Sequence, residues 1–488
     1  MNIKRVLTAS AFIAAPLSHA MKLEEIPGLL QQHSDAIKAE QSEIAARKED
    51  VWSSQSRYLP KVTWDTRFTH TDEPTTIDLD GSTLDSIQLG AANSALDLVS
   101  AGIAGQSPND QGTVLSDRIK QRKSAILGSL PKNEAKSIEV QKENFWKSNI
   151  TVSQPLYTGG RIAAGVKASK AKVSEAQSQE KTVYQAKLKD SLTRYFLVVL
   201  SENIISVLSD VEKDVTKMES ISNSLVQRGV LPKFEHLQIQ VAKAELNARQ
   251  KEATAKNQLA KIAFKSSLGL EQKQSVSYQS RLKNFQQIDS LESLIKASAA
   301  QRPEYGILAA KREALHALKS KETGELLPSL YAFGKYEVVD KYLTALEPNW
   351  AVGLGVKVEL GSYFSGFQKR AKAQHLLNKV NHKQAEATKN IPVQVQHFYT
   401  QAITQQSQME SLSVAENQAQ EALRLALVRF ESGQGSSLEI LKASTSLEQV
   451  KVKKLQAMGS YHISLVNLYW ATGKTENFIQ AYNNQGAK

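Results

Sequence analysis

Apolar and polar residues alternate along four short stretches of this chain, a pattern typical of β-strands with one apolar face. It predicts strands at about residues 61–69, 147–157, 329–337 and 350–361. In the last stretch Trp350, Val352 and Leu354 share one face, whereas Ala351 and Gly353 lie on the other. A bulky apolar face backed by small and charged residues is what a lipid-facing barrel strand requires. An edge strand of a soluble sandwich is the alternative.

Between these stretches the chain is rich in helix-forming residues, and two predicted helices are very long, at residues 162–227 and 364–430. At 1.5 Å per residue each spans roughly 100 Å. No compact domain of this size accommodates such rods, so we expect coiled-coil-like elements packed side by side. Pro392 lies inside the second rod, where it costs about 3 kcal/mol or produces a kink.

Each long helix is followed by a tight turn and a returning helix of about half its length. Gly229 and Gly433 supply the positive φ that such a reversal needs. Glu235 and Glu439 follow in the first turn of the returning helices, where the helix dipole favours an anion. The returning helices are predicted at residues 232–268 and 436–472, and shorter single helices at 27–58 and 290–322.

A constant offset relates the two halves of the chain. The pairs 204 residues apart are Gly229 and Gly433, Glu235 and Glu439, and Gly269 and Gly473. A fixed long offset marks a duplicated unit. We therefore expect a first structural repeat at residues 21–270, a second at 271–473, and a C-terminal tail at 474–488.

The segment between the first two strands, residues 71–143, breaks the pattern. It has no Lys or Arg from Thr71 to Asp117 and is some 60 residues longer than its counterpart in the second repeat. We expect a long surface loop with some internal structure, which is extracellular if the strands cross an outer membrane. Its Asp-Leu-Asp-Gly sequence at 78–81 resembles a fragment of a calcium loop, but without the remaining ligands a turn is expected.

Residues 1–20 have the three parts of a secretory signal peptide: a basic start, an apolar run and Ser-His-Ala before the cleavage site. The chain has no cysteine, which excludes a disulfide scaffold, a cysteine nucleophile and a lipid anchor on an N-terminal cysteine. No later apolar run approaches the roughly 20 residues of a membrane-spanning helix. Any membrane crossing is therefore expected to use strands closed into a barrel.

The net charge is +12, but the Lys and Arg residues are scattered among Glu and Gln along helices, which indicates a solvated helix surface and no nucleic-acid partner. The sequence has no HExxH spacing, no G-x-S-x-G and no phosphate loop. We therefore expect no enzyme activity, no cofactor and no metal site. Because about eight strands are needed to enclose a lumen, four strands per chain require several copies to pool their strands and helices.

On these features the chain resembles the TolC-type outer membrane efflux protein family over essentially the whole mature length. The residues that carry the resemblance are Leu-Pro before the first and third strands, Ser-Gln-Pro-Leu-Tyr-Thr-Gly-Gly-Arg at 153–161, the paired G-x5-[DE] turns, and Leu-Tyr-Trp-Ala-Thr-Gly at 468–473. The resemblance implies a mainly α-helical fold whose long antiparallel helices form a periplasmic tunnel. It also implies a homotrimer that closes a twelve-stranded barrel in the outer membrane of a Gram-negative cell.

In function, the resemblance implies a passive exit duct of a tripartite efflux or type I secretion system. The implied partners are outer-membrane lipid, a periplasmic adaptor (membrane fusion protein) and an inner-membrane pump. The alternative is a structural coiled-coil protein that spans the periplasm without channel activity. The exported substrate does not follow from the resemblance.

The family closes its periplasmic end with inward carboxylates and polar links near the turns. By register, Glu439 falls on the inner carboxylate ring, Lys442 on a second carboxylate and Glu235 on the carboxylate of the first repeat. Phe430 falls on a usual tyrosine and Gly435 on a usual arginine, so two links expected across the closed end are missing. The resemblance thus implies a periplasmic gate or constriction at these five residues.

The resemblance also implies that the adaptor docks on the turns. The expected docking residues are Gly229, Val230, Leu231, Gly433 and Gln434. Whether Arg228, Lys233 or Arg429 replaces the missing links stays open.

A constriction that mixes Glu439 with Lys442 is expected to be less cation-selective than a purely acidic one, so Glu439→Gln should shift ion selectivity toward anions. The alternative is that Glu439 is only a carboxylate at a helix start.

Overall fold

The computed structural model describes residues 20–79, 136–273, 276–278, 282, 288–339, 348–359 and 362–484. It divides the chain into two compact units. The helical unit comprises Met1–Gln55, Gly160–Gly324 and Gly361–Lys488, and the sheet unit comprises Ser56–Gly159 and Glu325–Leu360. Each unit takes segments from both predicted repeats, so the compact units cut across the duplication, and the repeat boundaries stay a prediction. Residues 1–19 of the predicted signal lie outside the described residues.

The sheet unit contains the four strands that the alternating pattern predicts. They are β2 (Lys61–His70), β5 (Asn144–Tyr157), β7 (Ser329–Val339) and β8 (Trp350–Lys357). They form one antiparallel sheet in the order β2-β5-β7-β8. The last strand ends at Lys357 and is therefore shorter than the predicted strand at 350–361. The outer edges of β2 and β8 have no partner strand among the described residues.

One face of this sheet is apolar and exposed. Trp64, Val352 and Val356 are 72%, 72% and 69% exposed. On the opposite face, rings from β7 lie over the glycines of β8: a Cβ on Gly353 would lie 3.0 Å from the ring of Phe333, and one on Gly355 would collide with Tyr331. The glycines therefore allow the aromatic side chains to lie flat on the sheet.

The predicted loop at 71–143 begins and ends in regular structure. β3 (Thr75–Leu79) pairs with β4 (Lys136–Gln141) in a separate antiparallel ladder. Asp78 lies within β3 opposite Ser137, so the prediction of a turn at 78–81 is wrong for this residue. Residues 80–135 lie outside the described part of the chain.

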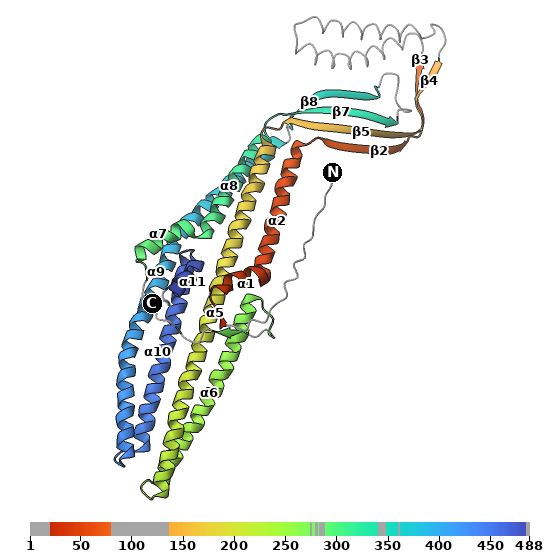
Figure 1. Cartoon of the computed structure of the whole chain (residues 1–488). Helices are drawn as coiled ribbons and strands as arrows, with labels where there is room; N and C mark the ends of the chain where they lie inside the picture. Colours follow the sequence, from red (N-terminus) through yellow and green to blue (C-terminus); the bar gives the residue numbers. More distant parts are fainter. Residues whose placement is uncertain are drawn as a thin grey trace. The chain divides into compact units, whose positions relative to one another are not determined.

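The helical unit is dominated by two hairpins (Figure 1). The first pairs α5 (Arg161–Gln227) with α6 (Lys233–Leu268), and the second pairs α9 (Ser362–Glu431) with α10 (Ser437–Ala471). Each returning helix lies along the C-terminal half of its long partner, the half that leads into the turn. α9 continues through Pro392 as a single helix.

The two shorter helices expected before the strands are each divided in two, so the predicted single helices are wrong. They form α1 (Glu25–His33), α2 (Asp35–Gln55), the 3-10 turn Ser56–Tyr58, α7 (Leu291–Gln301) and α8 (Pro303–Gly324). The breaks fall at Ser34 and Arg302, whose ψ values of 110° and 122° are extended. They are 268 residues apart, as are Leu59 and Leu327, so the break belongs to the duplicated pattern. At Arg302 the following proline explains it, since proline disfavours helical geometry in its predecessor.

The predicted C-terminal tail contains a further helix, α11 (Thr475–Asn484), whose Phe478, Ile479 and Tyr482 are buried. They join a core with residues of α1, α5, α6 and α10, where Phe196 and Phe478 meet edge to face with ring centroids 5.7 Å apart. The short parallel pair of β1 (Ala20–Met21) and β6 (Ser277–Tyr278) contributes to the same core. This core fixes the middle of the helical unit.

One window in α5 is long and apolar enough to cross a membrane by length and composition, with mean hydropathy 1.3, so the expectation that no such run exists is wrong. The helix nevertheless packs within the core of the helical unit: Leu192, Phe196 and Val199 are at most 1% exposed. Burial of a core helix accounts for this apolar character.

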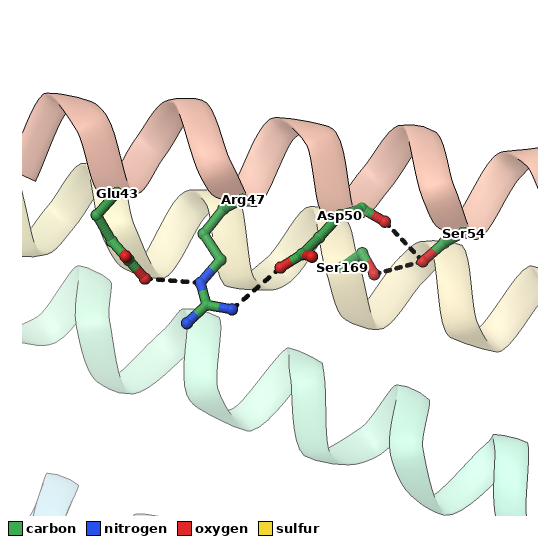
Figure 2. A network of polar contacts seen from close by, with 5 residues as sticks. All are labelled: Glu43, Arg47, Asp50, Ser54 and Ser169. Carbon is green, nitrogen blue, oxygen red and sulfur yellow. Dashed lines mark hydrogen bonds and ion pairs between the residues drawn. The ribbon is translucent and has the colours of Figure 1, made fainter.

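α2 packs along α5, and a network of polar contacts on α2 reaches α5 at one point (Figure 2). Arg47 bridges Glu43 at 2.8 Å and Asp50 at 3.0 Å on the surface of α2. The hydroxyl groups of Ser54 and Ser169 lie 2.7 Å apart and join the two helices. The exposed ion pairs contribute little to stability, on the order of 0–1 kcal/mol.

Candidate functional site

The two hairpin turns have the same backbone geometry. Gly229 and Gly433 have φ of 73° and 71°. The N–H of Val230 donates to Leu225 O at 2.9 Å, and the N–H of Gln434 donates to Arg429 O at 2.9 Å. These are the long-range hydrogen bonds of the Schellman motif. The positive φ expected at the turn glycines is confirmed.

The ends of the returning helices repeat this motif. Gly269 and Gly473 have φ of 72° and 76°, and Leu270 and Lys474 donate to the carbonyls of Lys265 and Tyr469. A Cβ on Gly269 would lie 2.6 Å from His33 O, and one on Gly473 would lie 2.6 Å from Gln301 O. Only glycine therefore suits these two positions, for both φ and space.

The predicted docking residues sit on these turns and are largely open. Val230 is 59% exposed, and Gly229, Gly433 and Gln434 are also exposed. A Cβ at either turn glycine would meet nothing within 4 Å. Leu231 is less open than the other turn residues: it is half-buried, because it packs against the apolar cluster between the hairpins.

Glu235 joins the two hairpins. Its Oε2 accepts a hydrogen bond from the backbone N–H of Ser437 at 2.8 Å and another from the Ser437 hydroxyl. That hydroxyl also lies 3.2 Å from Oε1 of Gln238. Ser437 is the first residue of α10, whose N–H groups lack helical partners and favour an anion. The carboxylate of the first repeat thus caps a helix of the second.

Glu439, the corresponding residue of the second repeat, lies in a different environment. Its backbone N–H donates to the capping hydroxyl of Ser436 at 3.3 Å. Its carboxylate lies 3.8 Å from Arg429, and the two side chains are 49% and 60% exposed. Lys442, one turn along α10, is exposed. Arg228, Lys233 and Arg429 were the candidates to replace the missing links. Among the described contacts, Arg429 is the one of the three that lies near a predicted gate carboxylate, that of Glu439.

Phe430 and Gly435 have packing roles. Phe430 is 1% exposed and lies in the apolar cluster with residues of α5, α6 and α10. A Cβ on Gly435 would lie 3.0 Å from the backbone nitrogen of Phe430. A longer side chain at position 435 would therefore crowd the turn, and a hydroxyl at 430 would be buried among apolar groups.

A second polar link joins α6 to α10 farther from the turns, and the sequence analysis missed it. Arg249 pairs with Glu448 at 3.1 Å, and the Glu448 side chain is 8% exposed. Burial raises the pKa of Glu448, while the charge of Arg249 opposes the shift. Between the two links lies an open groove of about 730 Å³ lined by residues that include Phe234, Leu237, Val241, Leu438 and Lys442.

Within the first hairpin, Lys243 donates to Glu219 at 2.6 Å. This hydrogen bond holds the pKa of the Glu219 carboxyl below its usual range. His236 Nδ1 lies 2.8 Å from the hydroxyl of Ser222. Among the described residues, no group of three or more His, Asp or Glu side chains is placed to hold a metal ion.

A family model described as "Outer membrane efflux protein" matches residues 124–269 and 294–474. The first matched segment ends at Gly269 and the second one residue beyond Gly473, the paired glycines of the two repeats. No curated protein matches the sequence.

Solved outer-membrane channels have the same fold. The CmeC outer membrane channel of Campylobacter jejuni is 15% identical, with a TM-score of 0.67 over 99% of this chain and 98% of that one. The open state of the Neisseria gonorrhoeae MtrE outer membrane channel is 12% identical, with a TM-score of 0.65 over 93% and 89%. VceC, an outer membrane protein of Vibrio cholerae, is 11% identical, with a TM-score of 0.66 over 92% and 96%.

Proposed function

This chain belongs to the outer membrane efflux protein family, and on that premise we propose that it forms, as a homotrimer, the exit duct of an efflux or type I secretion system in the outer membrane. The observation that carries the proposal is the open, one-sided sheet. Its apolar face is exposed, and both of its edges lack a partner strand among the described residues. Lipid covers the apolar face, and strands from other copies form the hydrogen bonds that the open edges of β2 and β8 lack within the chain.

The number of strands supports three copies. Four strands cannot close, and two copies supply about the minimum of eight, whose interior is filled by side chains. Three copies supply twelve and leave a lumen. The polar face of the sheet then lines the lumen, as the alternation of outer-membrane barrels requires.

The helical unit supports the same assembly. Exposed apolar side chains lie along α6 and α9, including Val241, Leu259, Val393, Val414 and Val428, each at least 52% exposed. Exposed apolar rows on helices of an isolated chain mark contact surfaces. We propose that α9 of one copy packs against α6 of the next, which continues the row of helices into a cylinder.

The turns are the proposed docking surface for a periplasmic adaptor that recruits an inner-membrane pump. Gly229, Val230, Gly433 and Gln434 are exposed, and Leu231 anchors the first turn to the core. We propose that residues 1–20 direct export and are removed.

We further propose that the turns form the gate. The Glu235–Ser437 contact holds the two hairpins together in the closed state, in place of the links that Phe430 and Gly435 cannot make. Glu439 and Lys442 border the passage, and Arg429 restrains Glu439. Release of the Glu235 contact lets the second hairpin move relative to the first.

The proposal is tested on the mature protein extracted from outer membranes. We expect trimers whose electrophoretic migration changes on heating and which conduct ions in planar bilayers. A protein that stays monomeric and water-soluble and gives no conductance would leave the structural coiled-coil hypothesis in its place.

For the gate, Glu235→Ala should increase the open probability, whereas Glu439→Gln should shift ion selectivity toward anions at similar open probability. Unchanged single-channel behaviour in both variants would contradict the gate assignment while leaving the duct intact.

A further inference from the structure

Two aromatic residues interrupt the polar face of the sheet, the face opposite the apolar one. Directly opposed residues of an antiparallel ladder share a face. Lys61 opposes Ser153, and Ser153 in turn opposes Phe333 of β7, which therefore lies on the polar face. Tyr331, two residues earlier on the same strand, lies on the same face. The inward face of a barrel strand is expected to carry polar side chains, so these two rings require an explanation.

The two rings rest on the bare backbone of the neighbouring strand. β7 lies between β5 and β8 (Figure 1), and Phe333 and Tyr331 directly oppose Gly353 and Gly355 of β8. A Cβ at Gly353 would lie 3.0 Å from the Phe333 ring, and one at Gly355 would collide with Tyr331. A glycine within a strand often marks the close approach of another group. The backbone of β8 therefore covers one side of each ring.

The other side of each ring is not covered by the strand on the opposite flank. On β5, Pro155 opposes Tyr331 and Ser153 opposes Phe333, and both side chains are too short to reach over an aromatic ring. Tyr331 and Phe333 are accordingly half-buried. Their ring centroids are 6.1 Å apart, within the range of a direct ring contact. The two rings thus form one aromatic platform that is open on the side away from the sheet.

Charge does not explain this platform. The next two residues of the same row on β7, Lys335 and Glu337, pair with each other. Covering the glycines of β8 accounts for one side of each ring, and a branched aliphatic side chain would serve there equally well. What a ring adds is a planar face, on which another planar ring stacks.

We propose that Tyr331 and Phe333 form a stacking platform in the wall of the lumen and that it binds planar aromatic cargo during export. The inference rests on the proposed duct, in which the polar face lines the lumen and three copies repeat the platform around it. Stacking on aromatic side chains tolerates many ring systems, because each of them has a π-face. The platform therefore selects a chemical class, compounds with planar aromatic rings, and not one compound.

Binding of proflavine, a planar aromatic monocation, to trimers in zwitterionic lipid nanodiscs tests the platform by fluorescence anisotropy. We expect saturable binding above that of empty nanodiscs, with about tenfold lower affinity in Tyr331→Leu/Phe333→Leu. Leucines still cover Gly353 and Gly355 but have no planar face, so this variant separates stacking from packing. Equal affinity in the two proteins would overturn the proposal.

Two matched variants should bind proflavine as tightly as the wild type. The exchange Tyr331→Phe/Phe333→Tyr keeps both rings, and Tyr336→Leu removes a ring from the apolar face of the same strand. Gly355→Ala should weaken binding, because the new Cβ lifts the Tyr331 ring off the sheet although the ring is kept. A loss of affinity in either matched variant, or full affinity in Gly355→Ala, would contradict the platform.

Competition identifies the class of ligand. Amantadine, a non-planar aliphatic monocation, should not displace proflavine, since it has the charge but no planar ring. Displacement by amantadine or by a maltodextrin would assign the site to cations or to saccharides and reject planar aromatic cargo. The variants are compared as trimers that conduct ions, so a failure of the platform leaves the duct intact. A wild type without conductance would reject the duct and, with it, this site.

Discussion

The turn of the first hairpin and the turn of the second share their backbone and differ in what their acidic residue does. Both reverse the chain through a glycine with φ near 70° and the same Schellman hydrogen bonds. Glu235 then accepts two hydrogen bonds from Ser437 in the other hairpin. Glu439, its equivalent by offset, stays at the surface near Arg429. Duplication thus preserved the fold of the turn, while the two carboxylates diverged into an internal tie and an exposed charge.

The shared backbone is tested most strongly at the helix ends. Gly473→Ala should cost about 3 kcal/mol, because it combines a disfavoured positive φ with a Cβ only 2.6 Å from Gln301 O. Gly433→Ala has the same φ but open space, so it should cost about 1 kcal/mol. Thermal unfolding followed by circular dichroism at 222 nm measures both. Equal losses would show that the close approach at Gly473 relaxes without cost.

The packing role of Phe430 predicts the next largest effect. Phe430→Tyr should destabilise the protein by about 2 kcal/mol, because the new hydroxyl is buried in an apolar cluster. Phe367→Tyr on the same helix is the matched control, since Phe367 is 58% exposed and should tolerate the hydroxyl. If Phe430→Tyr instead raised the unfolding midpoint, position 430 would have a polar partner across the hairpins.

The divergence of the two carboxylates predicts unequal losses. Glu235→Ala removes a charged acceptor of two hydrogen bonds and should cost about 2 kcal/mol. Glu439→Ala removes an exposed ion pair and should cost at most about 0.5 kcal/mol. Denaturant midpoints of the two variants give the comparison. A larger loss for Glu439→Ala would reverse the assignment of tie and exposed charge.

The smallest effects depend on pH and have opposite signs in the two hairpins. The pKa of Glu219 is lowered, so its stabilisation is present above the unfolded value and is lost as pH falls through the folded pKa. The pKa of Glu448 is raised, so its ionisation reduces stability as pH rises through the folded pKa. At pH 7, Glu219→Gln should lower the free energy of unfolding, and Glu448→Gln should leave it equal or higher. Each change should be about 1 kcal/mol or less. Both differences should vanish at a pH low enough to protonate both carboxyls, and matching signs at pH 7 would contradict the account.

Much of the fold follows from local patterns in the sequence. Alternation locates β2, β5 and β7 to within a few residues, and the glycines at a fixed offset locate the turns. The breaks at Ser34 and Arg302 were missed because the apolar pattern continues across them. A proline after Arg302 was the available signal.

The contacts of the candidate site could not be found in the same way. Glu235 and Ser437 are 202 residues apart in the sequence, and nothing local distinguishes Glu235 from Glu439. Arg249 and Glu448 are hidden among many other charges on helices. Such partners depend on how two hairpins pack, which helical periodicity does not specify.

The central claim is that the edges of the sheet pair between copies, and the absence of cysteine from this chain allows a direct test. Val62→Cys on β2 is combined in turn with Val352→Cys, Leu354→Cys or Val356→Cys on β8. Two strands separate β2 from β8 within one chain, a distance of about 14 Å that exceeds the reach of a disulfide, about 7 Å. After oxidation in the membrane, we predict that at least one pair gives dimers and trimers and nothing larger on a denaturing gel, and that no single variant does. No cross-link from any pair, or a ladder that continues beyond three chains, would contradict a closed trimeric barrel.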